Sequence, residues 1–240
     1  MDSGAVLNSA AVQPALASPS ETSPGNGTAF SSLARIGWTI LILATLGVCY
    51  FSHLGAIGFV GPDEPRYAWI ARDMTETGDW VTPRLYGKPW FEKPPLYYWS
   101  AAISLRLFGV SETAARLPSA LAALLATLAL AWLAWRVYGA ETARWLLLFL
   151  PTSVGMLGFS HAASTDMLFS SALILALVAA CVVLQLVPAR TWLACVLFGL
   201  FLGLAVLAKG PAAVVLLAGA VFFWALFYLA THVFNQTLKL

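Results

Sequence analysis

Charged side chains recur in the connections between apolar segments of this chain, and their types suit acid–base and phosphate chemistry. They are Asp63, Glu64, Arg66, Glu92, Lys93, Asp166 and Lys209. Charged groups at the edge of a bilayer are expensive, so those that persist usually face a protein interior, a cavity or a substrate. A catalytic or binding site at the membrane surface is therefore the leading hypothesis.

Asp63 and Arg66 lie directly after the first apolar run. A carboxylate at the membrane surface can take a proton from an acceptor hydroxyl or amine, and a guanidinium can bind phosphate through two N–H groups. A structural alternative is also open, because Asp63 or Glu64 could cap a helix that begins near Pro65.

Glu92 and Lys93 are followed by two adjacent prolines. The prolines fix an extended backbone, which would hold both charged side chains outward. The carboxylate of Glu92 could ligate a hard divalent cation, and the ammonium of Lys93 could meet a lipid-linked phosphate. The alternative is an ordinary turn between two surface helices.

The later connections carry His161, Asp166 and Lys209. Each has a structural interpretation: Asp166 is placed to cap the next helix, His161 can lie at the membrane interface, and Lys209 can anchor a helix end. Their joint placement on one face of the membrane favours a functional interpretation.

The composition identifies an integral membrane protein. Of 240 residues, 60% are hydrophobic and 10% are charged, against roughly 25% charged in soluble domains. The net charge of +2 and the lack of a basic run argue against a nucleic-acid partner. Cys49, Cys181 and Cys195 lie in apolar runs without metal-ligand spacing, so we assign them no function and no disulfide.

Helical spans of about 20 apolar residues are expected in about six places. These are residues 37–60, 117–135, 143–160, 167–187, 192–208 and 211–234. Pro118 falls in the first turn of the second span, and Pro151 should kink the third. Residues 1–35 are rich in small and polar types, which predicts a disordered cytoplasmic tail before a transmembrane domain over residues 36–240.

The long connection of residues 61–116 is predicted to hold two interfacial helices. In the first, an apolar face repeats at helical spacing and Gly78 is the stop signal. That face consists of Tyr67, Ile70, Ala71 and Met74. The second covers residues 96–108, with Tyr97, Tyr98 and Trp99 expected at the level of the lipid headgroups.

The short connections on the side of the N-terminal tail are rich in arginine, which predicts that this side is cytoplasmic. The long connection has basic residues of its own, but they are interspersed with acids in what looks like a folded unit, so we weigh the short connections more. The charged connections then face the periplasm.

These motifs resemble the N-terminal half of GT-C glycosyltransferases, in particular the lipid A aminoarabinose transferases and the dolichyl-phosphate-mannose protein mannosyltransferases. The resemblance extends over residues 36–235. It is carried by residues 63–67, 92–99, 165–166 and 209–211. It implies an all-α polytopic fold in the bacterial inner membrane, and transfer of a sugar from a polyprenyl-phosphate donor to lipid A, a protein or another envelope glycan.

The resemblance also implies roles for individual residues. Asp63 would be the catalytic base or a carboxylate that orients the acceptor, and Asp166 the second essential acid, while Glu92 would lie near a divalent metal. The donor phosphate would be bound by Arg66, Tyr67, Lys93 and Lys209. Glu64 and His161 are further candidates in the same connections.

Members of these families are longer than this chain, so a fragment, a split subunit or an inactive remnant is expected. The competing interpretation is a non-enzymatic component that binds or transports lipid-linked sugars. Transporters often contain internal repeats with broken helices at matching positions, and the sequence shows no such symmetry.

Overall fold

The computed structural model describes residues 25–184 and 189–237. Its contacts divide the chain into residues 1–37 and 38–240, and apart from the start of the first helix the features below lie in the second unit. The first helix, α1 (Gly25–Phe51), begins inside the predicted disordered tail. Residues 1–24 of that tail lie outside the described residues. The prediction was wrong for residues 25–35, because a helix that has nucleated gains one hydrogen bond for each residue it adds.

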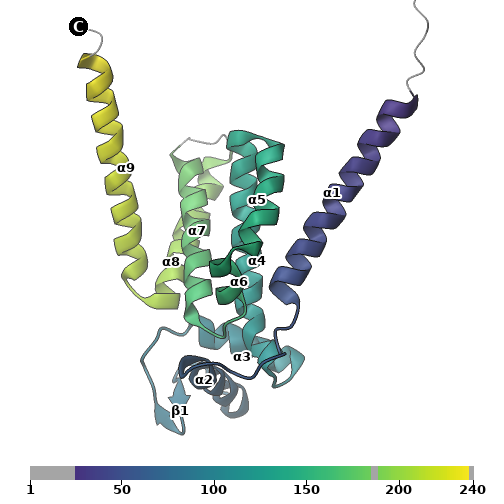
Figure 1. The fold of residues 1–240 in the computed structure, drawn as a ribbon. Helices are drawn as coiled ribbons and strands as arrows, with labels where there is room; N and C mark the ends of the chain where they lie inside the picture. Colours follow the sequence, from purple (N-terminus) through teal and green to yellow (C-terminus); the bar gives the residue numbers. More distant parts are fainter. Residues whose placement is uncertain (1–24, 185–188, 238–240) are drawn as a thin grey trace, which may run out of the picture. The chain divides into compact units, whose positions relative to one another are not determined.

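The described chain is helical almost throughout (Figure 1). The other elements are α2 (Asp63–Thr77), β1 (Arg84–Leu85), β2 (Lys88–Pro89), α3 (Leu96–Phe108), α4 (Glu112–Tyr138), α5 (Ala140–Thr152), α6 (Val154–Ser160), α7 (Thr165–Val183), α8 (Thr191–Lys209) and α9 (Ala212–Thr237). Among the described residues, 5 helices are long and apolar enough to cross a membrane, and 6 spans result if α5 and α6 count as one. The predicted all-α polytopic fold is confirmed.

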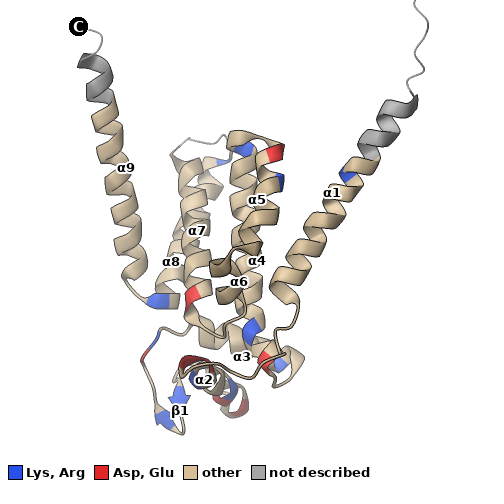
Figure 2. Cartoon of the chain, in the orientation of Figure 1, with Lys and Arg blue, Asp and Glu red and all other residues tan. Residues whose placement is uncertain are grey.

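Helices α4, α5, α7 and α8 stand side by side, and α2 and α3 lie across one end of them (Figure 1). Charged residues are concentrated at this end, around α2 and β1, and a smaller group lies at the opposite end of α4 and α5 (Figure 2). The helices between the two ends are almost free of charge. This distribution is typical of a bundle that crosses an apolar layer.

Helix α1 ends at Phe51, earlier than the predicted end of the first span at residue 60. His53 has a positive φ of 59°, and the N–H of Ala56 donates to the carbonyl oxygen of His53 at 3.0 Å. The chain therefore turns out of the helix. The carbonyl groups freed by this turn are bound by a distant arginine, described below.

Helix α4 begins at Glu112, before the predicted start at residue 117. Ser111 caps it, because its side-chain oxygen accepts the N–H of Ala114 at 3.2 Å. Pro118 consequently lies inside the helix and not in its first turn, which corrects the prediction.

The expected kink at Pro151 is confirmed as a bend of 61° between α5 and α6. The break frees backbone carbonyl groups, which the neighbouring hydroxyls bind. Thr152 Oγ1 donates to the carbonyl oxygen of Phe149 at 2.9 Å, and Ser153 Oγ donates to that of Leu150 at 2.7 Å. Such partners are required where a helix breaks within an apolar layer.

Helices α2 and α3 form a packed pair. Ile70, Ala71 and Met74 have no exposed surface, and Gly78 ends α2 with φ 74°, so the predicted apolar face and stop signal of this helix are confirmed. Helix α3 also has its predicted bounds. The placement of its aromatics was wrong for Tyr97 and Tyr98, which are buried in this core and not at headgroup level.

A short antiparallel hairpin of β1 and β2 lies between α2 and α3, with Arg84 opposite Pro89 and Leu85 opposite Lys88. The sequence analysis did not predict it. Its turn uses two residues with positive φ, Tyr86 at 50° and Gly87 at 77°.

Candidate active site

Asp63 and Arg66 lie one turn apart at the start of α2 and form an ion pair. Pro62 occupies the N-cap position, and no side chain caps the helix there. The capping role considered for Asp63 and Glu64 is therefore wrong. The side chain of Asp63 is 55% exposed, so part of its carboxylate is open to a reactant.

Glu92 and Lys93 reach the same place from the connection before α3. Glu92 Oε2 lies 3.4 Å from Arg66 Nη1 and accepts a hydrogen bond from Trp90 Nε1 at 3.1 Å. Lys93 Nζ lies 3.7 Å from Glu92 Oε1. Acidic and basic side chains thus alternate in one cluster. It consists of Asp63, Arg66, Glu92 and Lys93 and is called here the Arg66 cluster.

Asp166 and Lys209 form a second ion pair, between the first turn of α7 and the last turn of α8. The cap of α7 is Ser164, whose side-chain oxygen lies 3.4 Å from the N–H of Asp166. The expectation that Asp166 caps the helix was wrong. Its carboxylate instead forms the ion pair with Lys209. The ammonium of Lys209 also lies 5.6 Å from the ring centroid of Phe169.

Tyr67 connects these two groups electrostatically. Burial raises its pKa to about 12, and the carboxylates of Asp63, Glu92 and Asp166 act in the same direction while Arg66 opposes them. The hydroxyl therefore stays protonated and is able to donate a hydrogen bond at neutral pH. Since carboxylates from two connections act on one hydroxyl, the long connection and the start of α7 contribute charge to the same region.

Glu64, the next residue after Asp63, has different partners and forms a buried ion pair with Arg116. Arg116 Nη2 lies 2.8 Å and Nε 3.2 Å from its carboxylate oxygens. The backbone N–H groups of Val60 and Ala163 also donate to that carboxylate, each at 2.6 Å. Burial favours the protonated form, but the hydrogen bonds outweigh it and lower the pKa of Glu64, so the carboxylate stays charged.

Arg116 binds the turn that follows α1. Its guanidinium donates to the carbonyl oxygens of Leu54 and Ile57 at 2.7 Å and to that of Gly58 at 3.0 Å. The sequence analysis counted Arg116 only among the basic residues of the long connection. An arginine at the start of a long apolar helix was the available signal, because such a charge needs a buried partner.

His161 ends α6 and makes backbone contacts. Its Nδ1 lies 2.9 Å from the carbonyl oxygen of Leu157, and its Nε2 lies 3.0 Å from that of Ser52. The imidazole thus connects the broken span to the end of α1. No contact joins it to the Arg66 cluster within the described residues, so the structure separates this candidate from the others.

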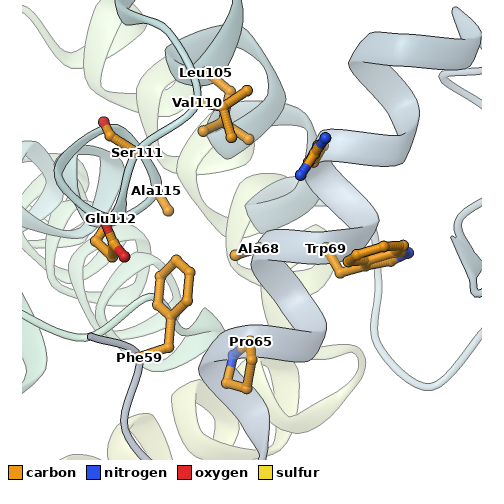
Figure 3. A pocket seen from close by; sticks show the side chains of 10 residues that line it. Phe59, Pro65, Ala68, Trp69, Leu105, Val110, Ser111, Glu112 and Ala115 are labelled. Atoms are coloured by element: carbon orange, nitrogen blue, oxygen red, sulfur yellow. The ribbon is translucent and has the colours of Figure 1, made fainter.

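A pocket of about 260 Å³ lies against another face of α2 (Figure 3). Phe59, Trp69 and Leu105 line it, together with Glu112 at the start of α4. None of the site residues predicted from the sequence lines this pocket, so the predicted site is not this cavity.

The predicted metal ligand Glu92 has cationic neighbours on both sides, Arg66 and Lys93. In the part of the chain that the structure describes, no group of three or more His, Cys, Asp or Glu side chains could hold a metal ion. A metal at Glu92 stays a prediction, and no step below depends on it.

Comparisons with known proteins show the family of this chain. The family model described as dolichyl-phosphate-mannose-protein mannosyltransferase matches residues 92–239. An undecaprenyl phosphate-α-4-amino-4-deoxy-L-arabinose arabinosyl transferase of Aeromonas salmonicida is 38% identical over 152 residues, which are 62% of this chain. Its counterpart in Pseudomonas aeruginosa is 34% identical over 178 residues, or 73% of this chain.

The fold is similar to that of a solved structure, ArnT from Cupriavidus metallidurans. The apo form matches with a TM-score of 0.76 over 81% of this chain, and the form bound to undecaprenyl phosphate with 0.73 over 80%, both at 32% identity. This chain spans about a third of these relatives, namely 28% of the Aeromonas protein, 32% of the Pseudomonas protein and 36% of ArnT.

Proposed function

Because this chain belongs to the dolichyl-phosphate-mannose-protein mannosyltransferase family, we propose that it takes part in transferring a sugar from a polyprenyl-phosphate donor to an acceptor of the cell envelope. The names of its relatives support undecaprenyl phosphate as the carrier and 4-amino-4-deoxy-L-arabinose as the sugar. The acceptor is lipid A, a protein hydroxyl or another envelope glycan.

The observation that carries this proposal is the meeting of acids and cations from two parts of the long connection: Asp63 and Arg66 form an ion pair at the start of α2, and Arg66 lies 3.4 Å from Glu92, which lies 3.7 Å from Lys93. The charges of Asp63, Glu92 and Asp166 also raise the pKa of the Tyr67 hydroxyl. All three acids are paired with cations: Asp63 and Glu92 with Arg66, Glu92 also with Lys93, and Asp166 with Lys209. A phosphate leaving group and an acceptor that must lose a proton need this combination of bases and fixed cations.

In the proposed reaction, Asp63 takes the proton of the acceptor hydroxyl or amine. At the same time the lone pair of the acceptor's oxygen or nitrogen forms a bond to the anomeric carbon of the donor. The bond between that carbon and the phosphate oxygen breaks, and its electron pair stays on the phosphate. Arg66, Lys93 and Lys209 stabilise the departing charge. Asp166 is the second essential acid, and its ion pair holds Lys209 in place.

The proposed location is the bacterial inner membrane, with the N-terminus in the cytoplasm and the charged end of the bundle at the periplasmic face. The arginine-rich short connections at the other end support this orientation. A donor lipid would then lie in the bilayer with its phosphate at the level of the Arg66 cluster.

Replacing Asp63 by Asn tests the catalytic role. The amide keeps the shape of the side chain but cannot take a proton, so we expect transfer to fall by about a hundredfold or more. The measurement is the rate of sugar transfer from the undecaprenyl-phosphate donor in membranes that contain the protein at equal levels.

Asp73→Asn is the matched control, because Asp73 lies on the same helix and forms no salt bridge with the described residues. Transfer that is unchanged by Asp63→Asn would contradict the proposal. A role in binding alone predicts that outcome, together with loss of donor-lipid binding when Lys93 or Lys209 is replaced.

A further inference from the structure

Tyr97 and Tyr98 are adjacent and have no exposed surface, yet their hydroxyl groups differ. Tyr97 donates to the carbonyl oxygen of Ala115 at 2.9 Å. The hydroxyl of Tyr98 is buried and has no hydrogen-bond partner among the described residues. An unpaired buried hydroxyl destabilises a protein, and most buried polar groups have a partner. Tyr98 thus holds a hydrogen-bonding group for which the described chain supplies no partner.

The side chain of Tyr98 lies beside the candidate site. Its ring meets that of Tyr67 edge-on, with centroids 5.9 Å apart and planes at 61°. Burial raises the pKa of Tyr98, and Tyr67, Glu92 and Asp63 add to the effect while Arg66 opposes it. The hydroxyl is therefore protonated, and the carboxylates of Asp63 and Glu92 both act on it.

We propose that the hydroxyl of Tyr98 donates a hydrogen bond to an oxygen of the donor's sugar unit. This inference rests on the proposed function. It assigns the sugar unit of the donor to the part of the site next to Tyr98. A sugar hydroxyl can accept from Tyr98 and donate to a carboxylate of Asp63 or Glu92. A phosphate oxygen carries negative charge, so these carboxylates repel it, and the cations Lys93 and Lys209 suit it better.

The hydroxyl oxygen is covered in this structure, so a neighbouring side chain must move before a ligand reaches it. Arg66, whose charge acts on this hydroxyl, is held by Asp63, by the carbonyl oxygen of Pro62 at 2.9 Å and by Glu92. Its side chain is 30% exposed, and its contact with Glu92 is long, at 3.4 Å. Exposed ion pairs of this kind contribute little to stability.

Tyr98→Phe tests the inference, with Tyr97→Phe as the matched control. Equilibrium binding is measured with two probes, undecaprenyl phosphate and undecaprenyl phosphate-α-4-amino-4-deoxy-L-arabinose, and the unfolding temperature of each variant is recorded. We expect Tyr98→Phe to weaken binding of the sugar-bearing lipid by about fivefold to tenfold, to leave the bare lipid unaffected, and not to lower the unfolding temperature.

Tyr97→Phe should do the opposite, because it leaves the carbonyl group of Ala115 without its donor. It should lower the unfolding temperature and leave the ratio of the two affinities unchanged. Equal weakening of both lipids by Tyr98→Phe would point to the phosphate and overturn the inference, as would unchanged binding of both or a lower unfolding temperature. If the unaltered chain binds neither lipid, the proposed function itself fails and the inference fails with it.

Discussion

Charged residues in this chain fall into two kinds according to what surrounds them. The Glu64–Arg116 pair has side chains that are 9% and 5% exposed, and backbone groups of Leu54 and Ala163 also bind it. The Asp63–Arg66 and Asp166–Lys209 pairs are much more exposed, with side chains between 30% and 55% accessible. Buried pairs hold segments together, whereas partly exposed pairs can exchange their partners for a substrate.

Arg116→Met should destabilise the protein strongly. The substitution leaves the carboxylate of Glu64 buried without its counter-ion and frees the carbonyl groups of Leu54, Ile57 and Gly58. Removing one partner of a buried pair costs about 3–5 kcal/mol. The measurement is the free energy of unfolding in mixed detergent micelles.

Arg72→Met is the control for this experiment, because Arg72 pairs with Glu76 on the surface of α2, where the two side chains are 47% and 56% exposed. Arg72→Met should lower the free energy of unfolding by less than about 1 kcal/mol. Similar losses for the two variants would show that the buried pair does not hold the connections together.

At the level of elements, the turn after α1 brings the first span against the start of α4. A Cβ added at Gly55 would collide with the side-chain oxygen of Thr113, whereas one added at Gly58 would meet nothing within 4 Å. Glycine at position 55 thus permits a close approach between two segments that are far apart in the sequence. The position of this turn also determines where α2 begins, and therefore where Asp63 lies.

Gly55→Ala should therefore lower stability by about 1–3 kcal/mol through overpacking, while Gly58→Ala should change it by less than about 0.5 kcal/mol. Thermal unfolding of the two variants in detergent provides the comparison. Adding Thr113→Ala to Gly55→Ala should restore most of the stability that Gly55→Ala removes. A double variant as unstable as Gly55→Ala alone would refute the steric explanation.

At the level of the whole molecule, the charged end of the bundle and its opposite end are separated by about 40 Å, the length of a helix such as α4 with its 27 residues. Val81 lies in the long connection at the charged end and is 84% exposed, and Tyr138 ends α4 and is 75% exposed. The proposed orientation places the first in the periplasm and the second in the cytoplasm.

Single cysteines at these positions test the orientation. In a chain whose Cys49, Cys181 and Cys195 are replaced by alanine, Val81→Cys should react with a membrane-impermeant maleimide in intact spheroplasts. Tyr138→Cys should react only after the membrane is permeabilised. The reverse pattern would invert the proposed topology and place the Arg66 cluster in the cytoplasm.

The sequence by itself determined the membrane class, the approximate spans, the kink at Pro151 and the two helices of the long connection. These follow from local properties: runs of apolar residues, helical spacing of buried side chains, and the backbone limits of proline and glycine. The charged residues of the site were also predicted from the sequence, because charges are rare enough in such a chain to be noticed individually.

Only the tertiary structure decided which charges meet. Asp63 and Asp166 were both open to a capping role on sequence grounds, but their partners are Arg66 and Lys209. Glu64, next to Asp63, is bound to Arg116, 52 residues away. The sequence predicted Tyr97 and Tyr98 at the surface, yet both are buried, and within the described residues the hydroxyl of Tyr97 has a hydrogen-bond partner while that of Tyr98 has none. Pairings of this kind depend on contacts between distant segments, which local patterns do not encode.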